Sequence, residues 1–154
     1  MKLSDMLFPE CILTNVQADS NTDVIRQLYE ALLHAGKVKT SFYKAVLARE
    51  KEYPTGLALE KWNAAIPHVV PEHVLHSALA IAVLKTPVAF QRMDDAELTT
   101  DVKVVFNIAL DNAGRQIDTL QQIMGVVTNT ALMSKIVEAG SPEEIIKLLK
   151  EEET

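Results

Sequence analysis

The chain has 154 residues, of which 48% are hydrophobic and 23% are charged, and these values are typical of one globular domain with a sizeable core. Its formal net charge of −6 argues against general binding to nucleic acid or to anionic membranes, and its single cysteine, Cys11, excludes an intrachain disulfide. We expect a cytoplasmic protein with no direct membrane insertion, because the N-terminus lacks the apolar run of a signal peptide and no stretch approaches the ~20 apolar residues that span a bilayer.

The first third of the chain predicts a short strand followed by two helices. The strand is expected at residues 11–15. The first helix should begin with a capping side chain from residues 20–22 and end at Gly36, which can adopt the left-handed conformation. The second helix should begin near residues 40–41 and end before Pro54, because the residue that precedes a proline is disfavoured in helical geometry.

The middle of the chain predicts strands. Residues 56–68 hold two short extended runs around a polar stretch, and residues 78–84 form the near-continuous apolar run of a buried strand. The Thr86–Pro87 pair is expected to end that strand, so that residues 88–90 form a separate short partner. A further buried strand is expected at residues 101–110.

The last third predicts three helices. The first is indicated by one apolar stripe, which consists of Ile117, Leu120, Met124 and Val127. The second covers residues 131–139, and in the third Ser141 is the N-cap while Glu144 completes a capping box. Together these elements predict an α/β fold, on the border with α+β, in which helices cover both faces of a mixed β-sheet of about five strands.

Three of the four histidines, His68, His73 and His76, lie within the segment PHVVPEHVLH. Two histidines at positions i and i+3 of a helix can share a metal ion, and His68 could add a third ligand. No HExxH signature is present, and Glu72 is the only nearby carboxylate. A metal-binding or ligand-binding module that uses these histidines is therefore one alternative, and polar residues of an ordinary turn are another.

His68 differs from the other histidines because a stiff segment presents it. It follows a strand-like run and then Pro67, which fixes its own φ and restricts Ile66. In α/β proteins the loops beyond strand ends carry binding and catalysis. A neutral imidazole is a good nucleophile that can hold a phosphoryl group covalently. These residues alone leave a functional and a structural role for His68 equally open.

The segment REKEYPTGLALEKWNAAIPH, residues 49–68, resembles the phosphorylation-site region of the fructose/mannitol-type IIA domains of the bacterial sugar phosphotransferase system. The resemblance rests on Arg49 at its start, on the Thr55–Gly56 pair, and on the Ala-Ile-Pro-His motif at residues 65–68. The downstream segment HSALAIAVLKTPVAF is similar to the family pattern S-x-x-A-I-x-x-L-x-x-P-V-x-F. The length also matches a free-standing IIA subunit, so the resemblance predicts one domain of this type over residues 1–154.

The form PHxxPEHV, in which His73 follows His68 by five residues, looks most like the galactitol-type branch of that family. Two departures from the wider family are present. Val69 stands where the residue after the active histidine is usually small. No histidine follows His76, whereas mannitol-like members carry a second active-site histidine after the last core strand. Gln116 takes that place, as in galactitol-type subunits, and it can form hydrogen bonds but cannot carry charge.

The resemblance implies a phosphotransferase component that works as a phosphoryl relay without a cofactor or a metal. His68 would accept a phosphoryl group from the phosphocarrier protein HPr, through Nε2, and would pass it to a IIB subunit or domain, where the expected acceptor is a cysteine. A IIC membrane subunit would take part indirectly, in the coupled uptake and phosphorylation of a galactitol-like polyol. A regulatory IIA-like sensor, whose phosphorylation state controls binding to a target protein, is the alternative.

The resemblance also implies supporting roles for Arg49, Thr55, His73 and Gln116. The planar fork of Arg49 suits phosphate oxygens, although the helix dipole also favours an arginine in the last turn of a helix. Thr55 would complete the anion pocket or form a plain turn. His73 would bind the phosphoryl group or fix His68, and Gln116 would bind the phosphoryl group or be exposed. Val69 and its two successors would form part of a shallow apolar face for two successive partners.

Overall fold

The computed structural model describes residues 2–153 of the chain, and within them five strands form one mixed sheet. The strands are β1 (Ile12–Val16), β2 (Gly56–Leu57), β3 (Asn63–Ala65), β4 (Ala78–Gln91) and β5 (Thr99–Ala109). Their order across the sheet is β1-β4-β5-β3-β2. The pairs β1–β4 and β3–β5 are parallel, whereas β4–β5 and β2–β3 are antiparallel.

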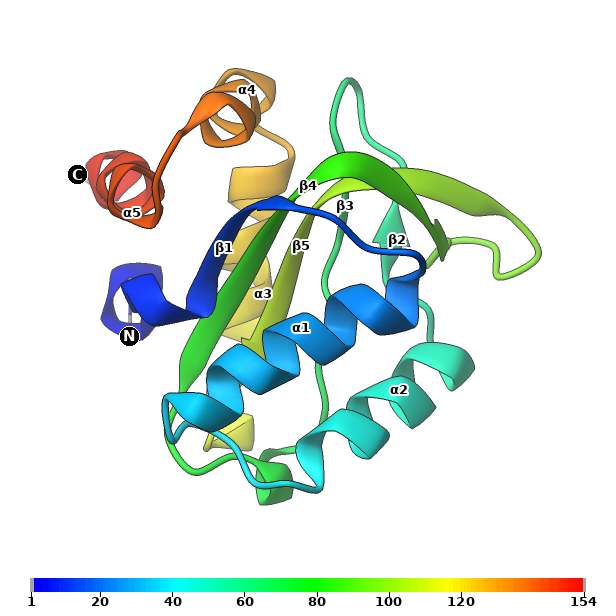
Figure 1. The fold of residues 1–154 in the computed structure, drawn as a ribbon, viewed down its shortest axis with the longest axis vertical. Helices are drawn as coiled ribbons and strands as arrows, with labels where there is room; N and C mark the ends of the chain where they lie inside the picture. The colour runs from blue at the N-terminus through cyan, green and yellow to red at the C-terminus, as the bar shows by residue number, and fades with distance from the viewer. Residues whose placement is uncertain (1, 154) are drawn as a thin grey trace.

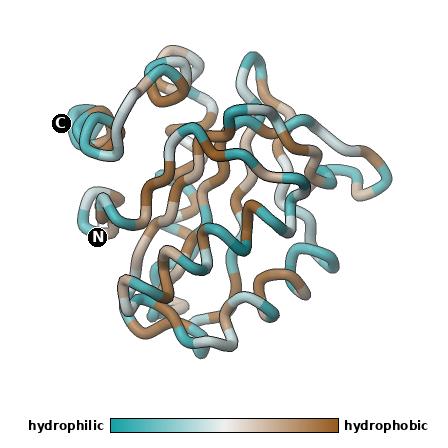
Figure 2. The backbone as a smooth tube through the Cα atoms, viewed as in Figure 1, coloured by the Kyte–Doolittle hydropathy of each residue, from teal (hydrophilic) through white to brown (hydrophobic). Residues whose placement is uncertain are grey.

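Helices cover both faces of this sheet (Figure 1). The two helices α1 (Asn21–His34) and α2 (Phe42–Glu52) lie on one face. The other face carries α3 (Gln116–Val127), α4 (Thr130–Glu138) and α5 (Pro142–Glu152). Each face has its own hydrophobic core, and Figure 2 shows hydrophobic residues along the strands and an alternation of hydrophobic and hydrophilic residues along α1. The predicted fold class, the approximate strand number and the two helical layers are therefore confirmed.

Local signals place the first two helices where the sequence predicts them. The backbone N–H of Asp23 donates to the side chain of Ser20, which is the N-cap of α1. Gly36, just beyond the end of this helix, has a φ of +74°, the left-handed conformation that glycine adopts without steric cost. Helix α2 ends at Glu52, two residues before Pro54. These caps and stops are short-range effects, so the sequence alone is enough to locate them.

The prediction that Pro87 ends a strand is wrong, because β4 continues through it to Gln91. Val83 pairs with Val104 of β5 and Val88 pairs with Val102, so the residues between Val83 and Val88 bulge out against a single partner residue. A bulge leaves backbone N–H groups outside the ladder, and proline, which has no N–H, is tolerated there. Both parts of β4 then pair with the same long strand.

The helix α3 itself is confirmed, and its predicted buried stripe is right for Val127, which is buried, and for Leu120, which packs half-buried against the core, but wrong for Ile117 and Met124. The buried residues of this helix are Thr119, Ile123, Val126 and Val127, whereas Ile117 is 74% exposed and Met124 is 36% exposed. The helix α3 therefore turns Ile117 and Met124 outward.

At the start of α5, Ser141 caps the helix as predicted. The side chain of Glu144 accepts a hydrogen bond from the N–H of Gly140 rather than from that of Ser141, so the predicted capping box does not form.

No helix within residues 2–153 is both long enough and apolar enough to cross a bilayer.

Candidate active site

His68 lies at the edge of the sheet where the parallel strands β3 and β5 end. The N–H of Ile108 donates to the carbonyl oxygen of Pro67 at 2.9 Å, and His68 itself forms a parallel bridge with Ile108. The chain after β3 therefore stays beside β5, although Pro67 has no N–H of its own to donate. The side chain of His68 is half-buried. This placement agrees with the strand-end presentation that the sequence predicts.

One hydrogen bond fixes which nitrogen of His68 carries the proton. Nδ1 lies 2.8 Å from the carbonyl oxygen of Ile66. A carbonyl oxygen only accepts, so Nδ1 must be protonated and Nε2 is left with a free lone pair. Burial lowers the pKa of His68; the bond to Ile66 works in the opposite direction, and the charge of Arg49 lowers the pKa further. The imidazole is therefore held neutral, with Nε2 as its nucleophilic atom.

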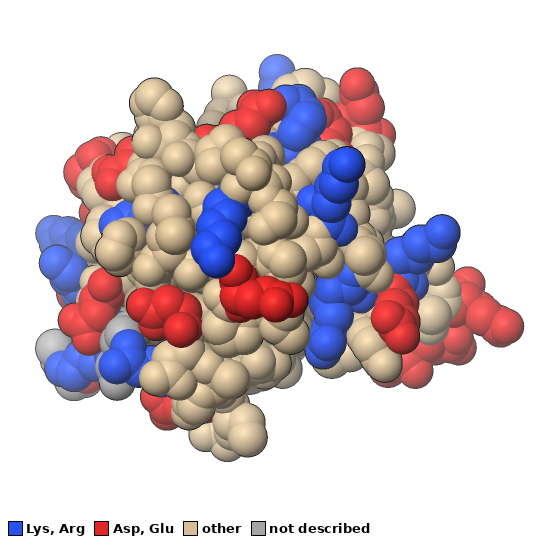
Figure 3. Space-filling view, turned by 90° about the horizontal axis from the view of Figure 1, so that it is seen from below, with Lys and Arg blue, Asp and Glu red and all other residues tan. Residues whose placement is uncertain are grey.

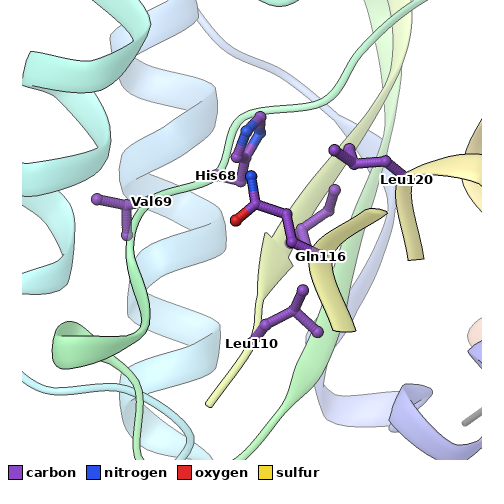
Figure 4. Close-up of a pocket in the computed structure, with 6 residues that line it drawn as sticks. His68, Val69, Leu110, Gln116 and Leu120 are labelled. Atoms are coloured by element: carbon purple, nitrogen blue, oxygen red, sulfur yellow. The ribbon is translucent and has the colours of Figure 1, made fainter. Parts of the chain in front are cut away.

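A small pocket adjoins this imidazole (Figure 4). It is lined by His68, Val69, Ile108, Leu110, Gln116 and Leu120. Its volume is about 10 Å³, which is room for about one water molecule. Gln116 is the first residue of α3, and its amide is turned toward His68. The structure thus brings Gln116 to His68, as the resemblance implies, while its contact with a phosphoryl group stays a prediction.

Arg49 approaches the site from α2. Its guanidinium lies over the ring of Tyr53, with 4.6 Å between Cζ and the ring centroid. Its Nε is buried and has no hydrogen-bond partner within the described part of the chain. A buried donor without a partner is costly unless an acceptor such as an anion or a water molecule meets it. Together with its effect on the pKa of His68, this leaves Arg49 suited to an anion beside the imidazole.

Thr55 lies behind the site rather than in the pocket, and only 2% of it is exposed. Its Oγ1 donates to Oε1 of Glu50 at 2.7 Å, and its N–H donates to Oε2 at 2.8 Å. The N–H of Ile66 in turn donates to Oγ1 of Thr55 at 3.2 Å. Thr55 therefore contacts the backbone that orients His68, and a direct bond from its hydroxyl to a phosphoryl oxygen stays untested.

Glu50 is a residue that the sequence-based prediction of the site did not include. It is 6% exposed, and burial raises its pKa from the ordinary 4.5 to about 7, although its two bonds to Thr55 work in the opposite direction. A signal was present in the spacing. Phe42, Val46 and Glu50 recur every four residues and form the buried face of α2, so the pattern places an acid among core residues.

His73 does not line the pocket beside His68. It ends the short turn η3 (Pro71–His73), its Nδ1 lies 2.8 Å from Oγ of Ser41, and its Nε2 lies 3.4 Å from the carboxylate of Glu72. The contact with Ser41, the residue before α2, ties η3 to the start of that helix. Within residues 2–153, no three His, Cys, Asp or Glu side chains are grouped to hold a metal ion.

Comparisons with known proteins give consistent matches to one family. A family model described as "Phosphoenolpyruvate-dependent sugar phosphotransferase system, EIIA 2" matches residues 5–152. The galactitol-specific EIIA component of Escherichia coli K12 is 28% identical over 116 residues, which cover 75% of this chain and 77% of that protein. The mannitol-specific enzyme IIA component of Staphylococcus aureus MRSA252 is 29% identical over 152 residues, which cover 97% and 98%.

The fold has a close counterpart among solved structures. It is similar to enzyme IIA in the complex of the mannitol-specific IIA with phosphorylated IIB from Escherichia coli, with a TM-score of 0.77 at 23% identity. The match covers 94% of this chain and 97% of that one.

Proposed function

Because the chain belongs to the EIIA 2 family of the phosphoenolpyruvate-dependent sugar phosphotransferase system, whose members are phosphotransferase relay proteins, we propose that it carries a phosphoryl group on Nε2 of His68. The observation that supports this most directly is the bond from Nδ1 of His68 to the carbonyl of Ile66. This bond leaves the Nε2 lone pair free in a half-buried, neutral imidazole. The donor is HPr, and the acceptor is a cysteine of a IIB partner.

Each half of the relay is an in-line displacement. The Nε2 lone pair of His68 attacks phosphorus while the bond from phosphorus to the HPr donor breaks, and the bonding electron pair stays with the donor. In the second half, the thiolate of IIB attacks phosphorus and the electron pair returns to Nε2. Arg49 stabilises the charge that spreads over the phosphoryl oxygens, and the amide N–H of Gln116 donates to one of them.

The surface around His68 suits two partners that dock in turn. Val70 is 47% exposed after His68, and on the neighbouring helix α3 Ile117 is 74% exposed and Met124 is 36% exposed. Figure 3 shows the lower end of the molecule in Figure 1, where uncharged surface alternates with single side chains of either sign. Apolar residues at the centre of such a surface contribute area without fixing one charge pattern, so HPr and IIB can share it.

We also assign the chain to a galactitol-like polyol system in the cytoplasm. Gln116 in place of a second histidine and His73 in the PEHV segment support this assignment, as does the similarity to a galactitol-specific component. The sugar itself binds the IIC membrane subunit, so only a pairing experiment identifies the system. The chain should pass its phosphoryl group faster to a galactitol-type IIB than to a mannitol-type IIB.

The test is incubation with Enzyme I, HPr and phosphoenolpyruvate, followed by intact-mass measurement and site mapping. One phosphoryl group should appear, and His68→Ala should abolish it. His34→Ala and His76→Ala serve as controls, because both histidines are exposed and neither lines the pocket. Labelling that survives in His68→Ala would overturn the proposal. A labelled protein that passes its group to neither IIB would instead favour the regulatory alternative.

A further inference from the structure

Glu50 is a buried acid that the phosphoryl relay does not use directly. Acidic side chains are seldom buried unless they are paired, and this one accepts two hydrogen bonds from Thr55 and forms no ion pair within residues 2–153. The raised pKa of about 7 shows that burial disfavours the charged form. Since an apolar residue would fill this position without that cost, the chemistry of the carboxylate needs a reason beyond packing.

The direction of the hydrogen bonds supplies that reason. The hydroxyl of Thr55 has one proton, and the N–H of Ile66, which can only donate, occupies a lone pair of Oγ1 at 3.2 Å. The hydroxyl proton must therefore go to Oε1 of Glu50 at 2.7 Å. The N–H of Thr55 goes to Oε2 at 2.8 Å. Both oxygens of the carboxyl group therefore accept from Thr55, which an amide, with only one acceptor atom, cannot reproduce.

This chain of bonds ends at the imidazole. The N–H of Ile66 donates to Oγ1 of Thr55, and the carbonyl oxygen of Ile66 accepts from Nδ1 of His68 at 2.8 Å. Ile66 is thus fixed at both of its backbone polar groups. The helix turn that contains Glu50 also contains Arg49, so the same anchor holds α2 next to the end of β3.

We propose that Glu50 is a positioning residue of the phosphoryl relay, which acts through Thr55 and the backbone of Ile66 to orient the imidazole of His68. This role rests on the proposed function of His68 as the phosphoryl carrier. Glu50 keeps Nδ1 protonated against the carbonyl of Ile66, so that Nε2 faces the incoming phosphorus. A purely structural anchor would stabilise the fold without affecting the proton or the rate.

Two substitutions break the chain of bonds at different places. Glu50→Gln keeps the size of the side chain but replaces one acceptor atom with a donor. Thr55→Val keeps the shape of Thr55 but removes the hydroxyl between Glu50 and Ile66. Thr55→Ser retains the hydroxyl and serves as the conservative variant. Glu52→Gln, at the exposed end of the same helix, is the matched control for loss of a charge.

The first measurement uses the free protein. Nitrogen-15 NMR of the His68 ring reports how the proton divides between Nδ1 and Nε2. Glu50→Gln and Thr55→Val should each shift the ring toward a mixture of the two tautomers, whereas Thr55→Ser and Glu52→Gln should match the wild type. Because this readout needs no HPr, it tests the orienting role even if His68 proves not to be the phosphorylated residue.

The second measurement is single-turnover transfer from phosphorylated HPr. Loss of the orienting bond should lower the rate at saturating HPr about tenfold in Glu50→Gln and Thr55→Val. The HPr concentration for half-maximal rate should stay within about twofold of wild type, because the docking surface is unchanged. A loss of stability in both variants with unaltered tautomer and unaltered saturating rate would overturn the proposal and leave Glu50 as an anchor only.

Discussion

Nδ1 of His68 and the carbonyl oxygen of Ile66 lie 2.8 Å apart, and this contact decides which nitrogen of the imidazole can react. In the proposed relay, the same contact would hold the proton on Nδ1 both before and after Nε2 takes a phosphoryl group. The ring therefore has no need to turn over between the step that accepts the group and the step that donates it. Little reorganisation is required between the two half-reactions.

The pKa of His68 should lie below that of an ordinary histidine when it is followed by NMR titration. Burial is the main cause, and the positive charge of Arg49 adds to it. Arg49→Ala should therefore raise the pKa of His68, while Arg26→Ala, which removes an exposed arginine of α1, should leave it unchanged. An unchanged pKa of His68 in Arg49→Ala would show that the guanidinium does not act on the imidazole.

Arg49 should matter more for transfer than for folding. Arg49→Ala loses a contact with Tyr53 and should cost about 1 kcal/mol of stability or less. The same change should lower the transfer rate by about an order of magnitude or more, because no other cation would replace the fork beside the phosphoryl oxygens. Arg49→Lys should recover only part of the rate, since an ammonium is not bidentate. Equal rates in all three proteins would make this arginine structural.

Gln116 gives the site a neutral hydrogen-bonding group where a second imidazole would titrate. Gln116→His should add a pH dependence to transfer between about pH 6 and 7, the range in which a histidine ionises. Gln116→Ala should slow transfer several-fold, by about the 1 kcal/mol of one lost hydrogen bond. Rate–pH profiles of the three proteins decide the matter, and superimposable profiles of equal height would place Gln116 outside the reaction.

Ile117 should contribute to docking and little to folding, because it is 74% exposed. Ile117→Ser should raise the HPr concentration for half-maximal transfer several-fold while the saturating rate and the melting temperature stay close to wild type. Leu98→Ser is the matched control, since Leu98 is exposed and similar in size to Ile117. It lies in the turn between β4 and β5, at the other end of β5 from His68. Equal effects of the two changes would argue against a docking role.

Glu50 should make the free energy of unfolding depend on pH. Its pKa is about 7 in the folded chain and 4.5 is its ordinary value, so the folded state binds the proton more tightly. The stability that this group contributes is fully present below about pH 4.5 and is lost as the pH rises through 7, by an amount on the order of 3 kcal/mol at most. Denaturant unfolding at several pH values should show that the free energy of unfolding falls less with rising pH in Glu50→Gln than in the wild type. Parallel curves would mean that this carboxyl has an ordinary pKa.

The sequence predicted those parts of the fold that depend on neighbouring residues. Caps such as Ser20 and stops such as Gly36 act within one turn, so their outcome does not depend on the rest of the fold. The end of the strand at Pro87 is predicted wrongly, because β4 can include this proline only where it bulges. The long strand β5 pairs with β4 on both sides of that bulge. The buried face of α3 is predicted only in part, because Ile117 is as apolar as a core residue and only the packed sheet shows which side of the helix is covered.

The candidate site divides in the same way. The sequence predicts three residues of the site, His68 and Arg49 from the motif of residues 49–68 and Gln116 from its position after the last core strand. The structure brings them to one edge of the sheet. The PHxxPEHV motif predicts His73 near His68 as well, but its ring contacts Ser41 and it does not line the pocket. The sequence does not single out Glu50, because an acidic side chain near a helix end usually faces water. Its role depends on the two donors of Thr55, which only the folded chain brings within reach.

The candidate site draws on both helical layers of the sheet. Arg49 belongs to α2 on one face of the sheet and Gln116 to α3 on the other face. His68, which follows β3, shares a pocket with Gln116 and is influenced by the charge of Arg49. Neither layer alone contains a complete site. Loosening of either layer would separate the partners of the imidazole even while the central strands remained paired. If the proposed relay is right, phosphoryl transfer is a stricter criterion of native assembly than secondary-structure content, because it requires both layers to be in place at once.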